Sequence, residues 1–272
     1  MLLHIAEKFL KVNYPRYVIM AFPAMRIFPV ILAVIITAAF FWMRDLAKTS
    51  GAPPYGMAEE EVPKAEPFSW LSDWKRPDGP ARVALQAGHW KAQEAPDELE
   101  RLRTNTGSSG GGKSEWEVNL EISRLVSEIL QKRGVTTEIL PATVPPEYLA
   151  DVFVAVHADG STDKSVSGFK IASPWRDWTG KAPDLADKIE AAYQLATGMK
   201  IDPNISRNMR GYYAFAFWRY NHAVHPMTTS VILETGFLTN AADRKTIVQN
   251  PQKSAQGLAE GILNYLEAQR LL

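Results

Sequence analysis

The chain has 272 residues, and its 30 basic and 30 acidic side chains give a net charge of zero at neutral pH. This balance argues against a dedicated nucleic-acid-binding protein, which needs a basic surface. The absence of cysteine excludes thiolate metal sites, thiol nucleophiles and disulfides, and it is compatible with an oxidising compartment.

The first predicted element is a membrane anchor. Residues 27–43 carry no charged side chain, and at a rise of about 1.5 Å per residue they just cross a bilayer core of about 30 Å if flanking arginines reach the interface. Basic residues are more numerous before this segment than just after it. The positive-inside rule therefore predicts a cytoplasmic segment at residues 1–26 and a single-pass protein whose catalytic domain lies outside the cytoplasm. A signal peptide cleaved near Ser50 and Ala52 is the alternative.

Residues 44–79 have the composition of a linker. Prolines recur along this stretch, and Glu59, Glu60 and Glu61 form a short acidic run. A partly extended chain of this length reaches on the order of 100 Å. The remaining residues, 80–272, have the usual size of one domain.

Two apolar runs of strand length each lead to a histidine. Residues 81–87 precede His89, and residues 151–156 precede His157. A lone histidine after a strand is more often a loop or core residue than a metal ligand. If the two strands are parallel neighbours, however, both imidazoles emerge at the carboxyl edge of one sheet, where open α/β folds bind ligands. A third apolar run ends at Glu234.

A helix is predicted over residues 115–132. Ser114 and Glu117 have the spacing of a capping box, so Glu117 is expected to fold back onto the start of the helix. Glu115 is then free to point at a metal ion. Its alternative role is to interact favourably with the helix dipole.

The rest of the domain alternates between strand and helix patterns. The expected elements are strands at 135–140, 167–172, 212–218 and 229–234, and helices at 182–197 and 252–269. Such alternation predicts an α/β fold with a mixed, mostly parallel sheet and helices on both faces, of the phosphorylase/hydrolase-like type.

Four of these residues form a set with hydrolytic chemistry. His89, Glu115 and His157 offer three nitrogen or oxygen ligands and leave one position open for water, which is the arrangement of a catalytic zinc. Glu234 supplies a further carboxylate, which can move protons for the bound water. The set predicts a metal-dependent hydrolase.

The order of these motifs resembles a known family. Gly-His at His89, the glutamate ahead of a V-N-L helix, V-H-A-D at His157 and L-E-T-G-F-L-T-N at Glu234 are similar to the zinc-dependent N-acetylmuramoyl-L-alanine amidases, which cut peptidoglycan. The similarity covers roughly residues 81–272. It implies that His89, Glu115 and His157 bind zinc and that Glu234 is catalytic. It also implies cleavage between the lactyl group of N-acetylmuramic acid and the first L-alanine of the stem peptide.

The chain departs from this family in two places. Trp90 follows the first histidine, where the family commonly has paired glycines. Only residues 141–150 separate two predicted strands between which the family usually carries an arginine-bearing stretch and a helix. Neither change removes a metal ligand, but both are expected to reshape the substrate cleft.

His222 and Arg219 are weaker candidates for substrate contact. His222 follows an aromatic segment and could approach the substrate, although a loop histidine without that role is the alternative. Arg219 could bind a stem-peptide carboxylate, or it could simply be solvated.

Two other functions remain open. A zinc exopeptidase or deacylase of related architecture would use the same metal ligands. A non-catalytic cell-wall-binding domain is the third possibility, although the complete set of ligands and base argues against it. The leading prediction is a membrane-tethered amidase whose partners are peptidoglycan and the lipid bilayer, with no nucleic acid.

Overall fold

The structure is a computed structural model that describes residues 71–272. The expected cytoplasmic segment 1–26, the expected transmembrane segment 27–43 and the linker as far as residue 70 lie outside the described residues. Among the helices that are described, none is both long enough and apolar enough to cross a membrane.

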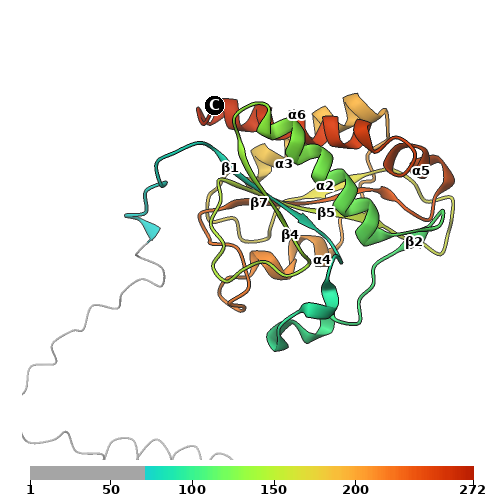
Figure 1. The fold of residues 1–272 in the computed structure, drawn as a ribbon, viewed down its shortest axis with the longest axis horizontal. Coiled ribbons are helices and arrows are strands. Elements are labelled where there is room, and N and C mark those ends of the chain that lie inside the picture. The colour runs from blue at the N-terminus through green and yellow to red at the C-terminus, as the bar shows by residue number, and fades with distance from the viewer. Residues whose placement is uncertain (1–70) are drawn as a thin grey trace, which may run out of the picture. The chain divides into compact units, whose positions relative to one another are not determined.

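A five-stranded sheet with the order β4-β1-β5-β7-β6 organises this part of the chain (Figure 1). Strand β1 (Arg82–Ala87) pairs in parallel with β4 (Thr136–Leu140) and with β5 (Val152–Asp159). Strand β5 pairs in parallel with β7 (Thr229–Phe237), and β6 (Lys170–Ala172) closes the edge antiparallel to β7. The expected mixed, mostly parallel sheet is confirmed.

The central strands are apolar because both of their faces are covered. Every residue of β5 from Val152 to Ala158 is buried, including His157. Side chains alternate across the sheet, so Val154 enters the core on one face while Phe153 and Ala155 enter the core on the other. Near-continuous burial of this kind is typical of parallel strands.

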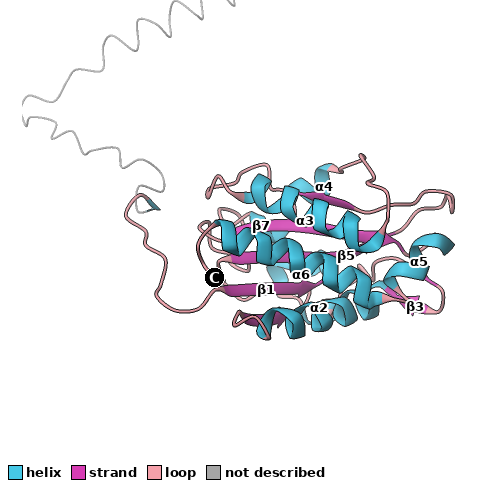
Figure 2. Cartoon of the chain, turned by 90° about the horizontal axis from the view of Figure 1, so that it is seen from above, coloured by secondary structure: helices cyan, strands magenta, loops and turns pink. Residues whose placement is uncertain are grey.

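Three long helices cover one face of the sheet (Figure 2). They are α2 (Glu115–Gln131), α3 (Ala182–Thr197) and α6 (Pro251–Ala268), and α6 packs against both of the others. A shorter helix, α5 (Ala241–Ile247), follows β7. These helices share one large core with the strand residues that face them.

The opposite face has a different cover. It carries α4 (Arg207–Arg210), the 3₁₀ helix η5 (Tyr213–Phe215) and loops, which share a second core with Phe153 and its neighbours. Helices therefore lie on both faces as expected, but on this face the described helices are short.

The predicted strand at 212–218 is wrong. Its alternating aromatic residues form η5 instead, and the Phe215 ring packs edge-on against Phe153 of β5 at a centroid distance of 6.3 Å. The Phe215 ring is thus buried against the face of the sheet, and the segment does not join the hydrogen-bonded ladder. The outer edge of β7 is already paired with β6.

Four smaller elements lie in the connection between β1 and α2. Between β1 and α2 the chain forms two 3₁₀ helices, η3 (Ala92–Glu94) and η4 (Asp97–Leu102), and then an antiparallel hairpin of β2 (Ser109–Gly110) and β3 (Lys113–Ser114). This segment connects the end of β1 to the start of α2.

Residues just ahead of β1 are held against the domain. The guanidinium of Arg76 donates to both carboxylate oxygens of Asp151, at 2.6 and 2.9 Å. The ring of Trp74 lies 6.1 Å from that of His225. Contacts with the domain therefore begin before residue 80, where the sequence predicts the end of the linker.

Close packing of α6 on α3 generates a test of this arrangement. A Cβ on Gly261 would lie 2.4 Å from the Cα of Ile189, so the two backbones leave no room for a methyl group. We expect Gly261→Ala to lower the free energy of unfolding by about 3 kcal/mol, measured by urea titration. Glu260→Ala, at an exposed position of the same helix, should change it by less than about 0.5 kcal/mol. Equal losses in the two variants would contradict the close approach.

Candidate metal centre

The three predicted metal ligands converge at the carboxyl edge of the parallel strands. His89 follows β1, His157 lies near the end of β5, and Glu115 is the first residue of α2. The N–H of Gly88 donates to the Val156 carbonyl at 2.9 Å, which ties the two histidine-bearing segments together. One donor atom from each of the three ligands lies within 4.8 Å of the other two.

The spacing of the donor atoms fits one divalent ion. Glu115 Oε1 lies 3.0 Å from His157 Nδ1 and 3.4 Å from His89 Nε2. Two donors that bind zinc at about 2.1 Å with tetrahedral geometry are about 3.4 Å apart. The imidazoles meet edge to face with a centroid distance of 5.1 Å. All three ligands therefore face a common point.

Backbone geometry orients His89. Its φ of 63° lies in the left-handed region, which a side chain other than glycine adopts at some energetic cost. Its Nδ1 lies 3.0 Å from the Asn105 carbonyl oxygen. Because a carbonyl can only accept, Nδ1 carries the proton in this contact and Nε2 is left for the metal.

Hydrogen bonds hold Glu115 as a carboxylate. Its Oε2 accepts from the Ser108 N–H at 2.6 Å, and its Oε1 accepts from the Ala158 N–H at 3.2 Å and from Asn119 Nδ2 at 3.3 Å. Burial opposes ionisation, but the hydrogen bond and charge of His157 and these donors outweigh it and lower the pKa of Glu115 to about 2.

The expected capping box of Ser114 and Glu117 is confirmed. Glu117 Oε2 accepts from the backbone N–H of Ser114 at 2.8 Å and completes the capping box. Glu115 is thereby left free to face the histidines. The two carboxylates are two positions apart on one helix and therefore point to different sides.

The electrostatic environments of the two histidines differ. Burial lowers the pKa of His89, because the charged imidazolium loses its hydration. Burial also disfavours the charged form of His157, but the hydrogen bond and negative charge of Glu115 outweigh it and raise the pKa of His157. Burial therefore dominates at His89, whereas the carboxylate of Glu115 dominates at His157.

Glu234 lies beside the ligand set and has a contrasting environment. It is the register partner of His157 across β5 and β7. Its Oε2 is buried and has no hydrogen-bond partner among the described residues. Burial, reinforced by the negative charge of Glu115, raises the pKa of Glu234 to about 8. Glu234 is therefore a carboxyl group that can exchange a proton near neutral pH, and its Oε2 has no hydrogen bond to the described residues.

An open cleft of about 630 Å³ gives access to these four residues. Its remaining walls are mostly polar and come from the loop before β2, the loop after β5 and the end of β7. They include Ser108, Ser161, Thr162, Lys164 and Thr239. Such walls offer hydrogen bonds to a polar ligand.

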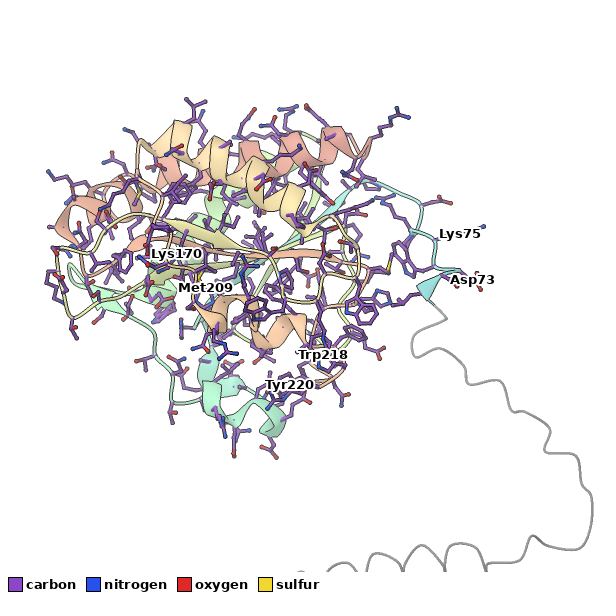
Figure 3. All side chains as sticks on the ribbon, turned by 180° about the vertical axis from the view of Figure 1, so that it is seen from behind. Asp73, Lys75, Lys170, Met209, Trp218 and Tyr220 are labelled. Atoms are coloured by element: carbon purple, nitrogen blue, oxygen red, sulfur yellow. The ribbon has the colours of Figure 1, made fainter. Side chains whose placement is uncertain are left out.

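The weaker candidates do not reach the cleft. His222 Nδ1 lies 2.6 Å from Glu98 Oε1, and Arg219 stacks over the Tyr220 ring at 5.0 Å. Neither residue lines the cleft. Lys170 is the register partner of Glu234 across β6 and β7 and so marks the position of the site. Tyr220, the neighbour of Arg219, lies well away from Lys170 (Figure 3). The expected substrate contact of His222 and Arg219 therefore has no geometric support, because local partners hold both side chains.

Tyr212, which contacts His157, was not predicted from the sequence. The hydroxyl oxygen of Tyr212 lies 3.4 Å from His157 Nε2, and its ring meets the His157 ring edge-on at a centroid distance of 5.6 Å. Tyr212 comes from the segment that the alternating pattern assigned to a strand. No local spacing in the sequence relates it to His157.

Comparison with known proteins gives a consistent family. A family model described as N-acetylmuramoyl-L-alanine amidase matches residues 83–264. The N-acetylmuramoyl-L-alanine amidase LytC of Bacillus subtilis (strain 168) is 28% identical over 175 residues, which cover 59% of this chain and 33% of LytC. The chain thus spans about a third of the length of that curated relative.

Solved structures share the fold. The N-acetylmuramoyl-L-alanine amidase AmiC2 of Nostoc punctiforme superposes with a TM-score of 0.51 at 20% identity and covers 70% of this chain and 99% of its own. An N-acetylmuramoyl-L-alanine amidase of Clostridium difficile 630 gives a TM-score of 0.50 at 16% identity, with coverages of 70% and 99%. The family model spans nearly all of the sheet and its helices, and the chain belongs to the N-acetylmuramoyl-L-alanine amidase family.

Proposed function

We propose that this protein is a zinc-dependent peptidoglycan amidase, which hydrolyses the amide bond between N-acetylmuramic acid and the L-alanine of the stem peptide. The observation that carries the proposal is the convergence of His89, Glu115 and His157 on one point beside Glu234, at the base of an open cleft. Family membership supports the substrate class.

Zinc suits the donors that the chain offers. The site supplies two imidazole nitrogens and one carboxylate oxygen, and three protein ligands of these types are typical of catalytic zinc, which keeps a further position open. When bound, the ion would supply a Lewis acid that polarises the scissile carbonyl and makes water more acidic. The hydrogen bonds to Glu115 keep this ligand anionic and fixed.

Glu234 is the group we assign to proton transfer. An attacking water must lose a proton, and the departing amine must gain one, so one carboxylate within reach of both can carry the proton between them. Among the described residues, Glu234 Oε2 has no hydrogen-bond partner that would have to be displaced first. A pKa near neutrality suits both halves of this transfer.

We also propose that the amidase domain acts outside the cytoplasm and is anchored in the membrane by residues 27–43. Two properties of the sequence support this location: the uncharged stretch itself, and the larger number of basic residues that precede it. The linker that follows would allow the domain to reach peptidoglycan some distance from the bilayer.

Product analysis tests the reaction. We expect the purified full-length protein in detergent to release new L-alanine amino termini from muropeptides, to lose this activity with a chelator and to regain it with zinc. Mass spectrometry of the products reads the bond that is cut. Release of terminal amino acids or acyl groups would instead support the exopeptidase or deacylase, and binding to the wall without cleavage would support a non-catalytic domain.

The role of Glu234 has its own test. We expect Glu234→Gln to retain bound zinc but to lower kcat by on the order of a hundredfold or more, because an amide cannot accept the proton of the water. Zinc content and kcat are measured on the same preparation. His89→Ala, which removes a ligand, should lose both. Turnover equal to wild type in Glu234→Gln would reject the role.

Gly88 provides a test of the metal site that does not alter a ligand. A Cβ at this position would lie 2.4 Å from Cε1 of His157, so Gly88→Ala should displace that ring and weaken zinc affinity by about tenfold or more, measured by chelator competition. Gly134→Ala is the control: its φ is +80° and a Cβ there would meet open space. It should reduce stability without changing zinc affinity, and equal zinc affinity in Gly88→Ala and wild type would contradict the prediction.

A further inference from the structure

A series of hydrogen bonds leads from His157 to residues that do not line the cleft. His157 Nε2 lies 3.4 Å from the hydroxyl oxygen of Tyr212, which donates to Gln86 Oε1 at 2.9 Å. Gln86 Nε2 in turn donates to the Ala142 carbonyl at 2.9 Å. These hydrogen bonds connect His157 to Tyr212 just before η5, to Gln86 of β1 and to the loop after β4.

The Ala142 carbonyl fixes the donor and acceptor of each of these hydrogen bonds. The Ala142 carbonyl can only accept, so the amide nitrogen of Gln86 must face it. The amide oxygen of Gln86 must then face Tyr212, and because this oxygen can only accept, the Tyr212 hydroxyl must donate to it. The Tyr212 oxygen is left with only lone pairs to offer His157.

The orientation of Gln86 has a second support. Its Nε2 also donates to the Tyr213 hydroxyl at 2.8 Å, and that hydroxyl donates to the same Ala142 carbonyl. Gln86 is completely buried, so rotating its amide would leave polar groups without partners in the protein interior, at a substantial cost. The series of hydrogen bonds therefore has one stable direction, in which Tyr212 donates to Gln86 and Gln86 donates to Ala142.

Ring packing fixes Tyr212 in place. Its ring lies edge-on to Phe215 at 5.6 Å and tilted against Tyr213 at 4.9 Å, in addition to its contact with His157. Tyr213 and Phe215 belong to η5, which packs against the sheet. The hydroxyl is thus held by a rigid element, as an accurately placed hydrogen-bond partner requires.

From this direction we infer that Tyr212 and Gln86 are positioning residues, which keep the proton of His157 on Nε2 and present Nδ1 to the metal ion. This inference rests on the proposed function only for the identity of the ion. Nδ1 is the nitrogen that lies 3.0 Å from Glu115 Oε1. An acceptor behind a metal-bound histidine fixes both the tautomer and the angle of the ring.

The two histidines are fixed by different kinds of acceptor. The backbone carbonyl of Asn105 accepts from Nδ1 of His89, so that histidine offers Nε2. A side-chain hydroxyl acts on Nε2 of His157, so this histidine offers Nδ1. Only the second acceptor can be removed by substitution, and this makes the inference testable at His157.

The test compares two variants that each lose one tyrosine hydroxyl. Tyr212→Phe removes the acceptor and keeps the ring. Tyr265→Phe removes a hydroxyl that donates to Thr229 Oγ1 at 3.0 Å, on a helix away from the metal centre. We expect Tyr212→Phe to weaken zinc affinity by about 10- to 100-fold in chelator competition with the full-length protein. Tyr265→Phe should bind zinc as wild type does, while unfolding of the metal-free proteins measures any loss of stability.

Two further readouts separate positioning from general stability. In ¹⁵N spectra of the zinc-loaded wild type, the His157 side chain should show a protonated Nε2 that exchanges slowly with solvent, and Tyr212→Phe should accelerate this exchange. Gln86→Met should weaken zinc affinity in the wild-type background but have little further effect in Tyr212→Phe, because Gln86 acts through the tyrosine hydroxyl.

Several results would overturn the inference. They are unchanged zinc affinity in Tyr212→Phe, an equal loss of affinity in Tyr265→Phe, additive effects of the Gln86 and Tyr212 changes, or a wild-type protein that binds no zinc. Zinc affinity is measured without substrate, so the proposed function can fail separately. A wild type that binds zinc but cuts no muropeptide would contradict the proposed function and leave the positioning role to be judged by zinc affinity alone.

Discussion

The site depends on one carboxylate held between two imidazoles. Glu115 Oε1 lies 3.0 Å from a nitrogen of His157 and 3.4 Å from a nitrogen of His89, and backbone N–H groups keep this buried oxygen pair ionised and stationary. Without that charge, the half-buried His89 and the buried His157 would face each other without a negative charge to favour a cation between them. The parallel pairing of β1 and β5 brings the histidines to one edge, and the start of α2 delivers the carboxylate.

Two glutamates of the site show how environment assigns chemistry to a common side chain. Glu115 accepts several hydrogen bonds, and its pKa falls to about 2, which suits a permanent ligand. Glu234 is half-buried, its Oε2 has no hydrogen-bond partner among the described residues, and its pKa rises to about 8, which suits a group that must gain and lose a proton. Pairs of titratable groups whose pKa values are driven apart are characteristic of acid–base assignments in enzymes. Both side chains face the same cleft.

Much of this site was predictable because it follows from local patterns. Strand-length apolar runs ending at His89 and His157 place both at one sheet edge, and the capping box at Glu117 singles out Glu115. Tyr212 was not predictable, because its contact with His157 depends on how a distant segment crosses the sheet. The same segment has the alternation of a strand but packs Phe215 against the sheet face as a 3₁₀ helix, so periodicity alone gave the wrong element.

A crystal structure of the zinc-loaded protein would test the central claim most directly. The account predicts one zinc ion within about 2.2 Å of His89 Nε2, Glu115 Oε1 and His157 Nδ1, with a position open toward the cleft. It also predicts that Nε2 of His157 still faces the Tyr212 hydroxyl. Zinc bound elsewhere, or bound through His157 Nε2 after rotation of the ring, would contradict the account.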